Sequence, residues 1–118
     1  MKDRILERFL RYVKIDTQSD EKVETCPSTQ KQFDLARLLK KELEDMGIEV
    51  TLDEKCYLMA KIPANTNESI PKIGFIAHVD TSPDYSGKKV NPQIHKNYSG
   101  DLIRLSGNTL LDPKEFPE

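Results

Sequence analysis

A nearly unbroken apolar run, "IGFIAHV" over residues 73–79, constrains the fold more than any other stretch of this sequence. The run lacks the alternation of a strand with one solvated face, so it predicts a strand that is covered on both faces. Strands of this kind lie at the centre of sheets flanked by helices. His78 falls within the run, and Asp80 and the turn sequence "TSPD" follow it.

His78 and Asp80 are separated by two positions, and such side chains project from the same face of a strand. We expect them at the carboxyl end of a central strand over about 72–79, where α/β sheets place their sites. An imidazole can bind a metal through one ring nitrogen while the other donates to a carboxylate. The same residue types also fit a hydrogen-bonded core histidine and an aspartate that begins a turn. The spacing alone leaves both interpretations open.

Two amphipathic helices are predicted before this run. The first covers residues 3–14, where apolar side chains recur at helical spacing. The second covers 29–46: Thr29 with Gln32 resembles a capping box, and Gly47 fits the C′ position. Its apolar face consists of Leu35, Ala36, Leu39, Leu43 and Met46.

Strand signals complete the predicted fold. Residues 48–62 contain two apolar stretches around a turn and predict a β-hairpin, and "LIRL" at 102–105 is a further short strand. The predicted fold class is therefore α/β, with helices packed on a mixed sheet that has its central strand at about 72–79.

Composition narrows the classes of function. A chain of 118 residues suffices for one ordinary domain with a core. Its formal net charge of −2 gives no reason to expect nucleic acid or a membrane as the main partner. No apolar stretch fits a signal peptide or a membrane span, so we expect a cytoplasmic protein. Cys26 and Cys56 form no C-x-x-C pair, which favours reduced thiols over a structural zinc site or a disulfide framework.

Longer motifs point to a family. The stretches "RYVKIDTQS", "PST", "LMAKIPAN", "HVDTSPD" and "GKKVNPQI" occur in this order along the chain. In this order they resemble the N-terminal part of the tripeptide aminopeptidases in the M20 family of co-catalytic zinc metallopeptidases. The resemblance runs from about residue 8 to the last residue.

This resemblance implies a function and two site residues. It implies that His78 is a ligand of one of two zinc ions and that Asp80 is catalytic, orienting His78 and tuning its basicity. In the family, the zinc pair polarises the scissile carbonyl and generates hydroxide, a glutamate acts as general base, and a tripeptide loses its N-terminal residue. Residues 17–19 belong to a matched segment that could line the site, but the substrate-binding residues stay unknown.

The resemblance also implies that the site is incomplete. The family takes its bridging aspartate, its general-base glutamate and its remaining ligands from motifs beyond the matched region. We therefore expect residues 1–118 to form only the N-terminal part of the catalytic domain, without its remainder or the second lid or dimerisation domain. On its own this part is expected to hydrolyse no peptide. His95 lies outside the matched motif and is not expected to act as a substitute ligand.

Two other functions remain open from the sequence. A central strand without neighbours leaves unpaired backbone groups and apolar surface, which favours a non-catalytic half-domain that associates with itself, as a homodimer, or with another chain. Other members of the same family cleave dipeptides, acylated amino acids or C-terminal residues, so the substrate class within the family is the second alternative.

Overall fold

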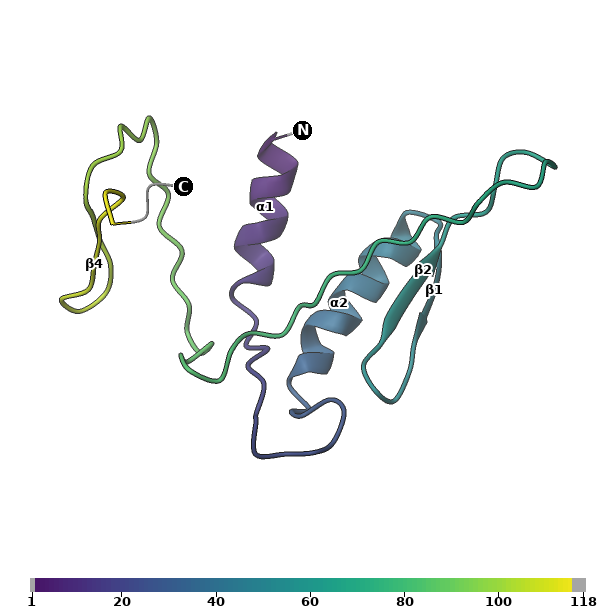
Figure 1. The fold of residues 1–118 in the computed structure, drawn as a ribbon, viewed down its shortest axis with the longest axis horizontal. Coiled ribbons are helices and arrows are strands. Elements are labelled where there is room, and N and C mark those ends of the chain that lie inside the picture. The colour runs from purple at the N-terminus through teal and green to yellow at the C-terminus, as the bar shows by residue number, and fades with distance from the viewer. Residues whose placement is uncertain (1, 116–118) are drawn as a thin grey trace.

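Two helices and two small antiparallel hairpins are the regular elements of residues 2–115, the part of the chain that this computed structural model describes (Figure 1). Along the chain they are α1 (Lys2–Tyr12), α2 (Gln32–Asp45), β1 (Glu49–Leu52), β2 (Leu58–Lys61), β3 (Ile103–Arg104) and β4 (Leu110–Leu111). No helix in this part of the chain has the length and apolar character needed to cross a membrane.

Both predicted helices are confirmed, but the predicted capping box of the second is wrong. α2 begins at Gln32, and its N-cap is Lys31, which makes no side-chain cap hydrogen bond. The Thr29 hydroxyl instead donates to the carbonyl oxygen of Gln18 at 2.8 Å and accepts from the Gln32 side-chain amide at 3.2 Å. The oxygen of this hydroxyl therefore accepts a side-chain amide where a capping box needs a backbone N–H, and the N–H groups of Gln32 and Phe33 bond the carbonyls of Thr29 and Gln30 in a tight turn before the helix.

The predicted C-terminal cap of α2 is confirmed. Gly47 has φ +77°, in the left-handed region that favours glycine. Its N–H donates to the Glu44 carbonyl at 2.8 Å, and the N–H of Ile48 donates to the Leu43 carbonyl at 3.1 Å. This pair of bonds is a Schellman motif, which reverses the chain from α2 into β1.

The predicted hairpin within 48–62 is also confirmed. β1 pairs antiparallel with β2, from Glu49 opposite Lys61 to Leu52 opposite Leu58. Alternate residues of β1 are half-buried, and β1 lies against α2, on which Leu35 and Ala36 are only 5% and 2% exposed. The buried residues of the described chain are Thr17, Pro27, Leu35 and Ala36.

The central strand predicted over 72–79 is wrong for the described chain. The backbone there runs as an extended trace (Figure 1), but within residues 2–115 it pairs with no other strand. Phe75 is 97% exposed, and Ile76 is fully exposed. The apolar pattern indicates burial, and burial requires neighbouring strands and covering helices that residues 2–115 do not supply.

The mixed sheet is wrong for the same reason. The two sheets are separate two-stranded antiparallel hairpins; the second pairs β3 with β4 and confirms the short strand predicted at 102–105. The radius of gyration is 18.2 Å, compared with about 13 Å for a compact domain of this length. The molecule is therefore open and has a small core between α2 and the β1–β2 hairpin.

Candidate functional site

His78 and Asp80 form a direct contact at the end of the extended segment. The Nδ1 atom of His78 lies 3.0 Å from Oδ1 of Asp80. The His78 side chain is 85% exposed and the Asp80 side chain 40% exposed. With Nδ1 turned to the carboxylate, Nε2 is the nitrogen left to bind another group, the arrangement found in carboxylate–histidine–metal triads.

The backbone around Asp80 is held by the loop that follows α1. The N–H of Thr81 donates to the carbonyl of Thr17 at 3.3 Å, and the N–H of Ser19 donates to the carbonyl of Thr81 at 3.0 Å. These two bonds form a parallel bridge between Gln18 and Thr81. Thr17 is only 2% exposed, and its hydroxyl donates to the Val79 carbonyl at 2.8 Å. Segments more than 60 residues apart are thus joined on both sides of Asp80.

The side chain of Gln18 closes the turn after Asp80. Its Nε2 donates to the carbonyl oxygens of Pro83 and Tyr85, each at 3.0 Å. The carbonyl of Gln18 in turn accepts from the Thr29 hydroxyl, which ties the loop to the residues before α2. The side chain of Gln18 thus supplies donors to two carbonyls of a turn in which Pro83 has no N–H to donate.

Asp16 anchors the other end of the loop. Its carboxylate lies 2.9 Å from Nζ of Lys31 and accepts the backbone N–H of Gln18 at 3.1 Å. Burial works to raise the pKa of Asp16, but the hydrogen bonds from Lys31 and Gln18 and the positive charges of Lys31 and Lys88 outweigh it and hold that pKa below the ordinary value. The carboxylate is therefore kept ionised beside the loop.

Gly87 packs directly on this anchor. A Cβ at that position would lie 2.8 Å from Oδ1 of Asp16 and 3.4 Å from the hydroxyl oxygen of Thr81. A side chain there would have to displace the Asp16 carboxylate, so the absence of a Cβ permits the close approach.

The donors present fit one part of a zinc site. An exposed imidazole whose second nitrogen meets a carboxylate suits a zinc ligand, whereas a catalytic zinc takes three protein ligands. Within residues 2–115, no three or more His, Cys, Asp or Glu side chains are grouped so that they could hold a metal ion. The structure thus places His78 and Asp80 in contact. Within the described chain, His95 does not join them in a metal-binding group.

The sequence did not reveal the roles of Asp16, Gln18 and Lys31. One signal was readable: an aspartate two residues before Gln18 can accept that residue's N–H, and this Asx-type bond forms. The partners of Gln18 on the far loop lie 65 and 67 residues away along the chain, and no local pattern predicts them.

No protein-family model matches the chain. Curated proteins named peptidase T match its whole length. The identity is 54% to the protein of Geobacillus thermodenitrificans, 52% to that of Bacillus mycoides and 53% to that of Lysinibacillus sphaericus. The chain spans only 29–30% of the length of these relatives. The predicted resemblance is confirmed: from its first residue to its last, this chain is homologous to a part of peptidase T.

Proposed function

We propose that this chain is the N-terminal part of the catalytic domain of a zinc-dependent tripeptide aminopeptidase of the M20 family. The relatives named peptidase T support this function, and the chain spans under a third of their length, so the activity of a whole enzyme is part of the proposal. The observation that carries the proposal is the 3.0 Å contact between Nδ1 of His78 and Oδ1 of Asp80, which leaves Nε2 for a metal.

In this proposal each residue has a separate task. His78 is a zinc ligand through Nε2, and Asp80 holds its ring orientation and raises its basicity. Thr17 and Gln18 fix the backbone on both sides of Asp80 through the bonds to Val79, Pro83 and Tyr85. When bound, a zinc pair supplies a Lewis acid for the scissile carbonyl and an activated water near neutral pH.

The rest of the site comes from outside residues 1–118 in this proposal. A two-zinc site needs more ligands than one histidine, and the general base is a further group. We therefore expect purified, zinc-loaded 1–118 to release no N-terminal residue from a tripeptide. Release that depends on added zinc would contradict this division of the site.

The function is tested in a chimera in which residues 1–118 replace the matching segment of the Geobacillus thermodenitrificans peptidase T. We expect the chimera to hydrolyse tripeptides and to leave acylated amino acids intact. His78→Ala should lower kcat/KM by more than about 100-fold, since even loss of a partner of a metal ligand costs about 10–100-fold. Asp80→Asn should weaken zinc binding within that smaller range.

His95→Ala is the matched control, because it removes an imidazole outside the motif. It should leave both the zinc content and kcat/KM unchanged. A chimera whose zinc content and activity survive His78→Ala would refute the site, and a preference for acylated amino acids would refute the substrate class. Circular dichroism of each variant separates loss of the site from loss of the fold.

A second candidate function is self-association through residues 72–79. It is favoured by the exposure of Phe75 and Ile76 beside a backbone that pairs with no strand within residues 2–115. Sedimentation of 1–118 should then show a dimer that Ile76→Asn dissociates. Ile62→Asn is the matched control, because Ile62 is 78% exposed outside this segment and its change should leave the dimer intact. A monomer at all concentrations would rule this candidate out.

A further inference from the structure

The two cysteines lie close together although 30 positions separate them in the sequence. Cys26 belongs to the loop before α2, and Cys56 to the turn between β1 and β2. The sulfur of Cys26 lies 3.4 Å from the carbonyl oxygen of Lys55 and 3.7 Å from the hydroxyl oxygen of Tyr57, the two neighbours of Cys56. Covalent geometry then places the Cα of Cys56 within roughly 6 Å of that sulfur.

The two thiols differ in accessibility. Cys26 is exposed, whereas Cys56 is half-buried. Burial, followed by the nearby Cys26, raises the pKa of the Cys56 thiol. An external oxidant therefore reaches Cys26 first, and Cys56 is placed to react with it second.

Both cysteines lie in segments without helix or strand structure. A disulfide needs Cβ atoms about 3.8 Å apart. Cys56 has φ +65° in a turn in which Asp53 accepts the N–H groups of Lys55 and Tyr57. Cys56 lies outside the paired residues of the two strands, Glu49–Leu52 and Leu58–Lys61, so it can move with this turn.

We propose that Cys26 and Cys56 are a site of reversible oxidation, at which a low-molecular-weight disulfide converts the two thiols into one intramolecular disulfide. The Cys26 thiolate attacks the oxidant, forms a mixed disulfide and releases one small thiol. The Cys56 thiolate then attacks the Cys26 sulfur and releases the second small thiol. Two protein thiols are oxidised, one small disulfide is reduced, and both protons leave with the two small thiols or the solvent.

The product links the loop over 20–28 to the β1–β2 turn. Residues 20–22 of that loop line an open hollow with Gln18 and Pro83, so the crosslink restrains a segment beside the candidate site. A reducing compartment keeps both thiols free, which makes the disulfide a response to oxidation and not a constant part of the fold. This inference does not depend on the proposed peptidase function.

The test treats the reduced 118-residue chain with glutathione disulfide and measures intact mass and free thiols over time. We expect a monomer about 2 Da lighter than the reduced chain, without bound glutathione, that returns to the reduced mass with dithiothreitol. Peptide mapping without reduction should identify the Cys26–Cys56 crosslink.

Three comparisons make this result decisive. Cys56→Ser should stop at a glutathione adduct on Cys26, and Cys26→Ser should react more slowly because Cys56 is half-buried. Closure in buffer should be at least about tenfold faster than in concentrated urea, since the fold raises the effective concentration of one thiol near the other. Stable glutathione adducts on the unchanged chain, crosslinked dimers alone, or equal rates in buffer and urea would each overturn the proposal.

Discussion

At the scale of single residues, one buried threonine holds the backbone that presents the two titratable groups of the candidate site. His78 and Asp80 are exposed or half-exposed, and their contact follows from two-residue spacing in an extended chain. Thr17 is 2% exposed, and its hydroxyl and carbonyl bind the residues on either side of Asp80. The direction in which the His78–Asp80 pair points is therefore fixed through Thr17.

Thr17→Val is expected to loosen the loop after His78. The change keeps the shape of the side chain and removes the donor to the Val79 carbonyl, at a cost of about 0.5–1.5 kcal/mol, the net contribution of one hydrogen bond. Hydrogen exchange should show faster exchange at the amides of Ser19 and Thr81. Thr51→Val, on an exposed position of β1, is the control and should leave these two amides unchanged. Equal exchange in both variants would contradict the role of Thr17.

Acid is expected to release the same loop through Asp16. The folded-state pKa of Asp16 is held below its ordinary value of 3.8, so its contribution to stability is present above that value and is lost as the pH falls through the lower, folded-state pKa. Amide exchange at Gln18, corrected for its intrinsic pH dependence, should therefore rise steeply below about pH 4. Asp16→Asn should abolish this step, and a step that persists in the variant would assign it to another carboxylate.

At the scale of elements, the local signals were reliable where neighbours along the chain satisfy the backbone. The end of α2 at Gly47 and the β1–β2 hairpin follow from glycine geometry and alternating apolar residues. The start of α2 was mispredicted because the Thr29 hydroxyl accepts the side-chain amide of Gln32 and the residues before the helix form a tighter turn. A capping pattern cannot show whether that hydroxyl accepts from a backbone N–H or from a side chain.

Gly47→Ala is expected to destabilise the junction between α2 and β1 by about 1 kcal/mol. A Cβ at Gly47 meets no atom within 4 Å, so the cost comes only from its φ of +77°. Gly74→Ala is the matched control, because that glycine also has open space and is not at positive φ. Thermal unfolding followed by circular dichroism at a helical wavelength should separate the two, and equal midpoints would show that the φ of Gly47 carries no cost.

At the scale of the whole molecule, the sequence predicted the regular elements better than their assembly. α1, α2 and the β1–β2 hairpin are local, whereas a central strand is defined by partners far away in the chain. The apolar run over 73–79 matches the pattern of a covered strand, yet Phe75 and Ile76 are fully exposed within residues 2–115. The same limit applies to the site: the local His78–Asp80 pair was predictable, and the contacts that Gln18 makes with Pro83 and Tyr85 were not.

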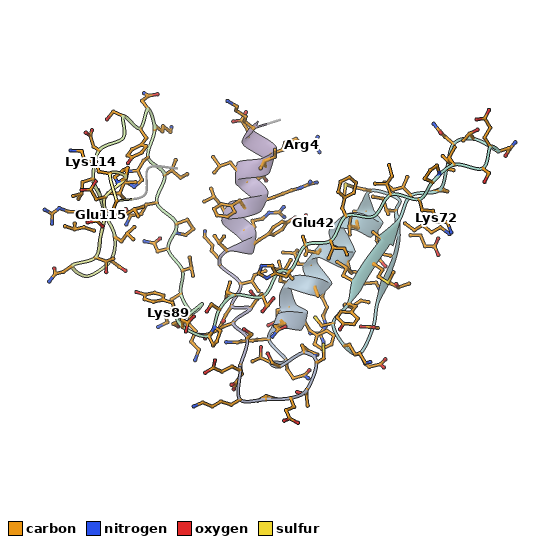
Figure 2. The ribbon with its side chains drawn as sticks, in the orientation of Figure 1. Arg4, Glu42, Lys72, Lys89, Lys114 and Glu115 are labelled. Carbon is orange, nitrogen blue, oxygen red and sulfur yellow. The ribbon has the colours of Figure 1, made fainter. Side chains whose placement is uncertain are left out.

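The attachment of α1 is a second consequence of the small core. No residue of α1 is buried, and Phe9 is 58% exposed. Glu42 of α2 instead joins the two helices, between which it lies in Figure 2. Nη1 of Arg11 lies 2.8 Å from Oε1 of Glu42, and the Tyr12 hydroxyl donates to Oε2 of Glu42 at 2.5 Å. Burial, followed by the bond to Glu42, raises the pKa of Tyr12 above its ordinary value of 10.0.

Glu42→Ala is therefore expected to release α1 while α2 and the hairpin persist. Removing the carboxylate takes away the ion-pair partner of Arg11 and the acceptor of the Tyr12 hydroxyl, and the few apolar contacts of α1 do not replace it. Amide exchange in α1 should increase by at least about tenfold, the factor that 1.4 kcal/mol produces. Glu44→Ala is the control on the same helix, because its pair with Lys40 spans 3.6 Å at exposed positions and contributes about 0.3–0.5 kcal/mol. If both variants change α1 equally, the helix is held by something other than the Glu42 carboxylate.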